Sequence, residues 1–158
     1  MSPFVEACFQ RQTCRTSTAE GAEPTWNETL SINLRAPNDD YSPSSLTKID
    51  ENIYLNLFDE IPVEVDDDIR LEKRWLGSLE IPFSTLYLNS KIEGTFKLNV
   101  PAVLLGYEYD SRFFNVGSTA SNYNSVNTYL TLFLTIDPTL PLPEPLVLKV
   151  CCITILFL

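Results

Sequence analysis

Apolar and polar side chains alternate strictly between residues 26 and 34. One parity of the chain is entirely polar, and the other carries Glu28 with the apolar residues Trp26, Leu30, Ile32 and Leu34. A period of two is typical of a β-strand that buries one face. We therefore predict a strand of an antiparallel sandwich over Trp26–Leu34.

Runs rich in aromatic and β-branched residues predict six further strands. They cover Phe4–Gln10, Gln12–Thr18, Ile53–Asp59, Trp75–Ile81, Thr95–Val100 and Tyr129–Ile136. The first two are expected to form a hairpin. Seven strands of this kind predict an all-β fold, an antiparallel β-sandwich.

Two stretches between these strands lack a strand pattern and are predicted to be loops. Residues 60–73 form a long connection, and residues 110–127 are rich in Ser, Asn, Gly and Thr. Loops of this length are usually functional or disordered. The first contains Asp66, Asp67 and Asp68, which could attract a cation. Three consecutive carboxylates point in different directions, so a solvated acidic loop is the favoured interpretation.

The residue types around Trp26 are informative in addition to their alternation. Pro24-Thr25-Trp26-Asn27-Glu28 resembles the Asn-Pro-x-Trp-Asn-Glu signature of the C2 domain, with Glu23 in place of the leading Asn. Residues 53–60 and 75–83 resemble the paired strands that flank the third ligand-binding loop of C2 domains, and residues 2–5 stand where those domains have Asp-Pro-Tyr-Val. The resemblance covers residues 2 to about 137.

Three further stretches narrow the resemblance. They are Thr18-Ala19-Glu20-Gly21, Arg35-Ala36-Pro37-Asn38 and residues 101–107, Pro-Ala-Val-Leu-Leu-Gly-Tyr. They resemble the C2 domain of the coiled-coil and C2 domain-containing protein 2 family, proteins of the ciliary transition zone. The resemblance implies a cytoplasmic scaffold at the basal body and transition zone of the cilium, with other members of that complex as partners and a role in cilium assembly. It also implies a fragment or partial isoform, because the family's full-length members carry further regions.

The resemblance divides the chain into a C2 domain at residues 1–137, incomplete at its N-terminus, and a proline-rich linker with an apolar tail at residues 138–158. In a C2 sandwich the strand preceding Ser2 lies between the equivalents of Tyr129–Ile136 and Trp26–Leu34, so the fold is expected to lack its first strand. The thirteen-residue tail Leu146–Leu158 is shorter than the ~20 residues of a membrane-spanning helix. One hypothesis is that it turns back antiparallel beside Tyr129–Ile136 and substitutes for the missing strand. The alternative is an exposed, aggregation-prone extension.

Composition narrows the possible functions. The chain has 158 residues, the size of one domain, and eleven basic against twenty-one acidic residues give a net charge of −10. Affinity for phosphate-rich partners depends on neutralising contacts, so nucleic acid is not expected and membrane contact is expected to be weak or indirect. The four cysteines form no CxxC pair, which favours a reduced cytosolic protein with free thiols.

The chain contains no histidine. Cys–His and Ser–His catalysis are therefore excluded, and the commonest ligand for transition metals is missing. Asp59 and Glu60 could be imagined as a catalytic acid and base, but no nucleophile, phosphate-binding loop or metal cluster accompanies them. We predict that the protein is not an enzyme and has no cofactor.

Calcium-binding C2 domains gather carboxylates from two loops at one end of the sandwich, because the ion takes six to eight oxygen ligands. By resemblance, four of those ligand positions correspond to Ser2, Asp59, Ile61 and Arg74. Only Asp59 keeps a carboxylate, and Arg74 brings a positive charge to the place of the cation. We therefore predict no metal site at these degenerate positions.

Many C2 domains also recognise phosphoinositides through a lysine-rich face on the strands that correspond to residues 4–18. This chain offers Arg11 and Arg15 there, beside Glu6 and Glu20. Each arginine would add only ~1 kcal/mol near an anionic membrane. A calcium-independent protein-interaction scaffold is therefore the favoured function, and a calcium-independent phospholipid- or membrane-docking C2 domain is the alternative.

Overall fold

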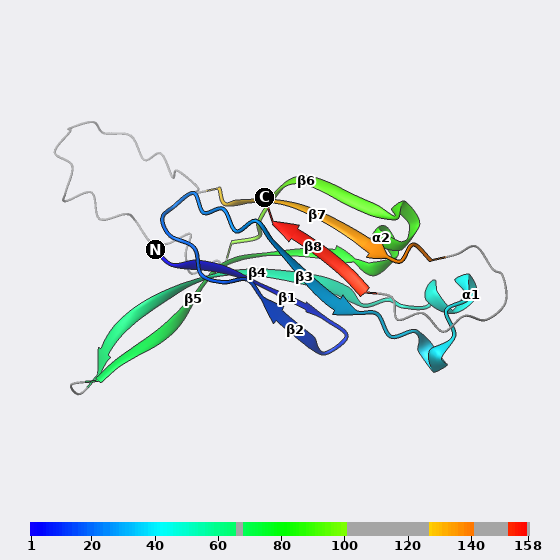
Figure 1. Cartoon of the computed structure of the whole chain (residues 1–158), viewed down its shortest axis with the longest axis horizontal. Coiled ribbons are helices and arrows are strands. Elements are labelled where there is room, and N and C mark those ends of the chain that lie inside the picture. The colour runs from blue at the N-terminus through cyan, green and yellow to red at the C-terminus, as the bar shows by residue number, and fades with distance from the viewer. Residues whose placement is uncertain (66–67, 101–126, 141–151, 158) are drawn as a thin grey trace.

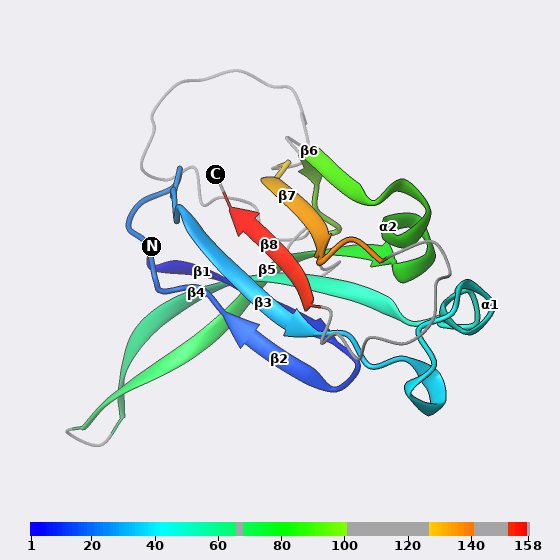
Figure 2. The same ribbon diagram turned by 45° about the vertical axis from the view of Figure 1, so that its right-hand side comes forward.

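A computed structural model describes residues 1–65, 68–100, 127–140 and 152–157, and it contains two four-stranded antiparallel sheets. The first sheet has the order β2 (Gln12–Arg15), β1 (Pro3–Phe9), β4 (Asn52–Val65), β5 (Asp68–Pro82). The second has the order β3 (Glu28–Asn33), β8 (Cys152–Phe157), β7 (Tyr129–Asp137), β6 (Lys91–Lys97). The sheets lie one in front of the other (Figures 1 and 2). The prediction of an all-β C2-type sandwich is confirmed.

The predicted strand Trp26–Leu34 is shorter than the alternation suggested. Asn27 has a φ of 48°, which breaks the extended backbone, and β3 begins at Glu28. Trp26 lies ahead of the strand, edge-on to Phe157 with ring centroids 6.1 Å apart. The apolar parity is buried as predicted, with Leu30 and Ile32 in the core.

The predicted hairpin of the first two strands is present, and its second strand ends early. Gln10 and Arg11 both have positive φ, at 47° and 60°, as a two-residue type I′ turn requires. The strand predicted over Gln12–Thr18 ends at Arg15, because the buried Thr16 turns its hydroxyl to accept a hydrogen bond from the Val5 N–H at 3.0 Å.

The prediction of a long loop over residues 60–73 is wrong. β4 and β5 continue through it in register, from the Asp59–Arg74 pair to the Val65–Asp68 pair. β4 and β5 therefore form a long hairpin that extends away from the sandwich (Figure 1). The sequence does alternate here, but both parities contain charged residues, which hid the pattern.

Part of the apolar tail forms β8, which lies between β3 and β7, the place that the substitution hypothesis predicted. β8 pairs antiparallel with β7 on one side and with β3 on the other. Its inward side chains, Ile153, Ile155 and Phe157, are fully buried. The substitution hypothesis is confirmed for residues 152–157, and the alternative of an exposed extension is wrong for them. The division of the chain at residue 137 stays a prediction, although β8 is structurally part of the sandwich.

Smaller differences concern the remaining elements. The strand predicted over Thr95–Val100 is β6, Lys91–Lys97, and beyond it Asn99 makes an isolated bridge to Ser78. A helix, α2 (Phe83–Asn89), follows β5. Two short helices, η1 (Pro37–Asp39) and α1 (Pro43–Leu46), lie between β3 and β4. The second predicted loop lies outside the described residues except for residue 127.

Candidate functional site: the Asp59 end and the outer face of the first sheet

Asp59 lies at the end of the sandwich where β1 begins, in register with Pro3. Only 2% of the residue is exposed. Its Oδ1 accepts a hydrogen bond from the Ser2 backbone N–H at 2.7 Å, and its Oδ2 accepts one from Arg74 Nη2 at 2.8 Å. Both carboxylate oxygens therefore already have donors from the chain itself.

The other three positions compared with calcium ligands, Ser2, Ile61 and Arg74, lie near Asp59 in the structure. Ser2 contributes its backbone N–H, Arg74 contributes a guanidinium, and the half-buried Ile61 has no oxygen on its side chain. The arginine supplies the positive charge that balances the buried Asp59 carboxylate. Within the described residues, no three or more Asp, Glu or Cys side chains are grouped so that they could hold a metal ion.

A second group, of charged and aromatic side chains, lies on the outer face of the first sheet, next to this end. It consists of six residues that we call the cation–aromatic cluster: Phe4, Glu6, Arg15, Phe58, Glu60 and Lys73. Phe4 stacks on Phe58 with ring centroids 5.4 Å apart. Arg15 and Lys73 lie over the Phe4 ring, at 4.6 and 5.2 Å from its centroid, and together they leave Phe4 with no exposed surface.

Both cations of the cluster are paired with carboxylates. Arg15 Nη1 lies 2.8 Å from Glu60 Oε1, and Lys73 Nζ lies 3.6 Å from Glu6 Oε2. The cluster thus joins β1, β2, β4 and β5 while its formal charges cancel. Each of the two cations is about half exposed, so either pair contributes little to stability by its charge alone.

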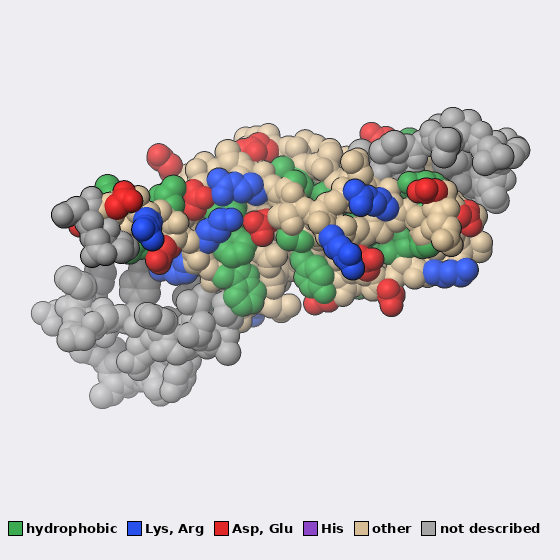
Figure 3. Space-filling view, turned by 90° about the horizontal axis from the view of Figure 1, so that it is seen from below, with side chains coloured by type: hydrophobic (Ala, Val, Ile, Leu, Met, Phe, Trp, Pro, Cys, Tyr) green, Lys and Arg blue, Asp and Glu red, His purple; other side chains and the backbone are tan. Residues whose placement is uncertain are grey.

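The two arginines considered for phosphoinositide binding do not converge. Arg15 belongs to the cluster, whereas Arg11 lies in the β1–β2 turn at the opposite end of β2. Glu20 is exposed, and Glu6 is the partner of Lys73. Figure 3 shows basic side chains on one face of the molecule separated by acidic and apolar ones, without a continuous basic patch.

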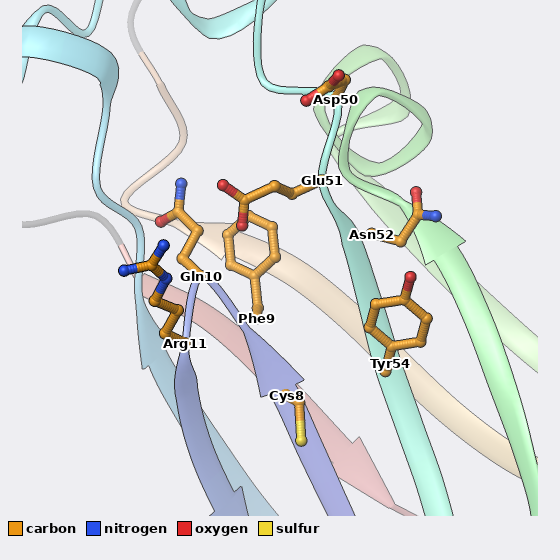
Figure 4. Close-up of a pocket in the computed structure, with 8 residues that line it drawn as sticks. All are labelled: Cys8, Phe9, Gln10, Arg11, Asp50, Glu51, Asn52 and Tyr54. Atoms are coloured by element: carbon orange, nitrogen blue, oxygen red, sulfur yellow. The ribbon is translucent and has the colours of Figure 1, made fainter.

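An open hollow of about 270 Å³ lies at the Arg11 end of the first sheet. Figure 4 shows Gln10 and Arg11 from the β1–β2 turn on one side and Asp50, Glu51 and Asn52 on the other. The Gln10 side chain exchanges two hydrogen bonds of 2.8 Å with the backbone of Arg35. These two bonds hold the turn against the segment after β3, which accounts for the Gln10 side chain structurally.

The two cysteines that the structure describes fully are free thiols on opposite faces of the hairpin. Cys8 is on the outer face, in register with Thr13, whereas Cys14 is in register with Ala7, whose side chain is in the core. Burial raises the pKa of the Cys14 thiol above its ordinary value, and the nearby Cys8 adds to this effect. A disulfide between them is not favoured by this arrangement.

The sequence analysis placed Asp59 and Arg74 at one end of the fold, but it did not identify Glu60 and Lys73 as members of the cation–aromatic cluster. These two are directly opposite each other in the β4–β5 register. The signal was the alternation of Ile61, Val63 and Val65 after Asp59, which would have extended the strand through Glu60.

A two-sheet sandwich with these positions at one end is the architecture of a C2 domain, and the family model for the C2 domain matches residues 1–98. The human (Homo sapiens) protein named Protein CC2D2B is 40% identical over an alignment of 146 residues that covers 86% of this chain and 10% of that protein. The Drosophila melanogaster protein named Coiled-coil and C2 domain-containing protein 2A is 32% identical over an alignment of 112 residues that covers 67% of this chain and 8% of that protein. The chain therefore belongs to the C2 domain family, within the C2 domains of the coiled-coil and C2 domain-containing protein 2 family.

The chain spans about a tenth of the length of these two relatives. No solved structure matches it. None of the helices in the described ranges is long and apolar enough to cross a membrane.

Proposed function

We propose that this C2 domain is a non-enzymatic protein-interaction module that works without calcium. The observation that carries the proposal is the Asp59–Arg74 ion pair, with 2.8 Å between Oδ2 and Nη2 around a carboxylate that is almost fully buried. A calcium ion would have to displace the guanidinium and recruit oxygen ligands that Ile61 does not have. The Arg74 guanidinium thus neutralises the Asp59 carboxylate, as a bound metal ion would.

The ion pairs of Asp59 and Glu60 also argue against a catalytic role for these two carboxylates. Asp59 and Glu60 are consecutive residues of a strand, so their side chains point to opposite faces of the sheet. Each is already paired, Asp59 with Arg74 and Glu60 with Arg15. Two carboxylates on opposite faces cannot act as acid and base on one substrate.

Protein binding is also favoured over membrane docking. The two cations on the outer face of the first sheet, Arg15 and Lys73, have carboxylate partners on the same face. An anionic head group would have to compete with Glu60 and Glu6 for them, and the chain as a whole carries a net charge of −10.

By its family, the place of action that we propose is the transition zone and basal body of the cilium. There the domain would serve in the scaffold that takes part in cilium assembly, with other members of that complex as partners. The similarity to the two named relatives supports this location.

Calcium and membrane binding are tested on the purified chain. Millimolar calcium should leave the melting temperature unchanged, since only a ligand that prefers the native state stabilises it. A rise of several degrees that Asp59→Asn abolishes would contradict the proposal. Sedimentation with phosphatidylserine and phosphoinositide vesicles, with and without calcium, should leave the protein in the supernatant. Pelleting that Arg15→Ala reduces would instead support the membrane-docking alternative.

The location is tested by imaging the tagged chain in ciliated cells beside a basal-body marker. We expect enrichment at the base of the cilium, and an even cytoplasmic distribution would contradict the proposed place of action. Affinity capture from the same cells should then recover transition zone proteins. A broad hydrolase screen of the purified chain should detect no activity.

A further inference from the structure

The end of the β4–β5 hairpin leaves the sandwich as a two-stranded ribbon. The pairing of β1 with β4 stops at Pro3 and Asp59, whereas β4 and β5 remain paired up to Val65 and Asp68. We call residues 60–65 and 68–73 the β4–β5 arm, and Figures 1 and 2 both show it projecting from the body. A two-stranded ribbon is marginally stable by itself, and a third or fourth strand stabilises it.

The hydrogen-bond pattern identifies which backbone groups the arm presents outward. The Glu60 N–H donates to the Ser2 carbonyl at 3.0 Å, so it points away from β5. Lys73 is opposite Glu60, and in such a non-hydrogen-bonded pair both residues direct their N–H and C=O groups outward. The period of two gives the same outward direction to Leu71 and Ile69 on β5.

The two edges of the arm differ in their ability to pair with another strand. On β4 the outward position opposite Leu71 is Pro62, which has no N–H and therefore blocks strand pairing. On β5 the outward positions 69, 71 and 73 all have an N–H. In the described part of the chain, β5 is paired on this side only at Ser78, which bridges Asn99. The β5 edge of the arm can thus accept another strand.

The sequence of this edge is complementary to itself. Consider β5 paired antiparallel with the β5 of a second copy, with Leu71 on the two-fold axis. Arg70 of one copy then faces Glu72 of the other, and Asp68 faces Arg74. The symmetry makes each of these contacts occur twice. A shift that centres the pairing on Arg70 or on Glu72 places like charges opposite each other, which is destabilising. Neither Arg70 nor Glu72 has an ion pair with another described residue.

The same register joins the apolar side chains of the edge. Ile69 and Leu71 are each 66% exposed, and they share a face of β5 with Lys73. Across the axis Leu71 meets its symmetry mate, and Ile69 lies opposite Lys73, whose methylene stem can cover it. Pairing would therefore remove an exposed apolar pair from water.

We propose that two copies of this chain associate through the β5 edges of their arms, antiparallel and centred on Leu71. The result is a four-stranded arm in the order β4-β5-β5-β4, with the two sandwiches at opposite ends. The interface is small, so the dimer forms at raised concentration or when other regions bring two copies together. This inference goes beyond the proposed function and does not depend on calcium or on cilia.

Sedimentation velocity of the 158-residue chain over a concentration series tests the association. We expect a monomer–dimer equilibrium whose dissociation constant rises at least tenfold in Arg70→Glu and in Glu72→Arg. The double variant, R70E/E72R, restores opposite charges and should recover the wild-type constant. A chain that stays monomeric up to about 0.5 mM, or a dimer that the single charge reversals leave unchanged, would overturn the proposal.

Two further variants test the edge and the register. Leu71→Pro removes an outward N–H and no hydrogen bond between β4 and β5, so it should abolish the dimer while circular dichroism and the melting temperature stay near wild type. Leu71→Cys should form an intermolecular disulfide on mild oxidation, because an opposed hydrogen-bonded pair has Cα atoms ~5.5 Å apart. Arg70→Cys, with the same native cysteines, is the matched control and should crosslink far less. Equal crosslinking of both would refute the register.

Discussion

The substitution Ile155→Ala tests whether the C-terminal strand is a working part of the core. Ile155 is fully buried, and its register partners are Leu30 on β3 and Leu134 on β7, both of them core residues. Strands on both sides hold these neighbours in place, so they cannot move far enough to fill the space that the shorter side chain leaves. The cost should therefore be near the full cost of a core cavity.

The magnitude follows from that geometry. Truncating a buried isoleucine to alanine costs about 2 to 5 kcal/mol, against a total stability of about 5 to 15 kcal/mol for a typical domain. With a urea dependence of about 1 to 3 kcal/mol per molar, the unfolding midpoint should fall by roughly 1 to 3 M. Removing residues 152–158 altogether eliminates three such core side chains and should leave the chain insoluble or unfolded.

Equilibrium urea unfolding followed by tryptophan fluorescence measures this effect. Thr154→Ala is the matched control, because Thr154 is adjacent in the same strand and on the opposite face, in register with Ser31 and Thr135. It should cost less than about 1 kcal/mol. If Ile155→Ala costs no more than Thr154→Ala, or if the truncated chain is more soluble and equally folded, the tail is not a core strand and our reasoning is wrong.

Three further predictions concern single positions. Gly77→Ala should lower stability by about 1 to 3 kcal/mol in urea unfolding, because the added Cβ would lie 3.1 Å from the Asn99 carbonyl oxygen. Arg74→Met should cost about 1 to 3 kcal/mol in urea unfolding at pH 7, since it leaves the buried Asp59 carboxylate without its cation. The raised pKa of Cys14 means that the unfolded thiol ionises first, so stability should fall as the pH rises above the ordinary cysteine pKa, and less so in Cys14→Ala.

Most of the sandwich could be predicted from the sequence because its strands bury one face. Leu30 and Ile32 on β3, and the alternating residues of β7, show a period of two with a polar opposite face. The tail was harder, because both of its faces are apolar apart from Lys149 and Thr154. The outer face of β8 is only partly buried, so its apolar residues carry no periodic signal.

The arm could not be predicted by the same rule because it has no buried face. Ile61 and Val63 alternate with Glu60, Pro62 and Glu64, but the strand is outside the core and its sequence reads as charged and proline-interrupted. In the described residues beyond Glu60, the pairing of β4 with β5 holds it as a strand. Patterns that arise from core burial do not detect an element of this kind.

The candidate site was partly predictable for a related reason. The resemblance placed Asp59 and Arg74 at one end of the fold, and the structure joins their side chains. The Lys73–Glu6 contact, in contrast, depends on the register of β4 between β1 and β5. No spacing in the sequence encodes it, since the two residues meet only after three strands have paired.

Three ion pairs meet where the arm leaves the sandwich. Asp59 and Arg74 form the last β4–β5 residue pair before the arm begins, and their side chains form one ion pair. The next residue pair, Glu60 and Lys73, is bound to β2 through Arg15 and to β1 through Glu6. In a calcium-binding C2 domain the charges at this end would be balanced by a removable ion. Here they are balanced by side chains of the same chain, which no chelator removes. Salt screens the two exposed pairs and reaches the buried Asp59 much less. These three pairs hold the base of the arm with charges of the chain itself, as the proposed calcium-independent function requires.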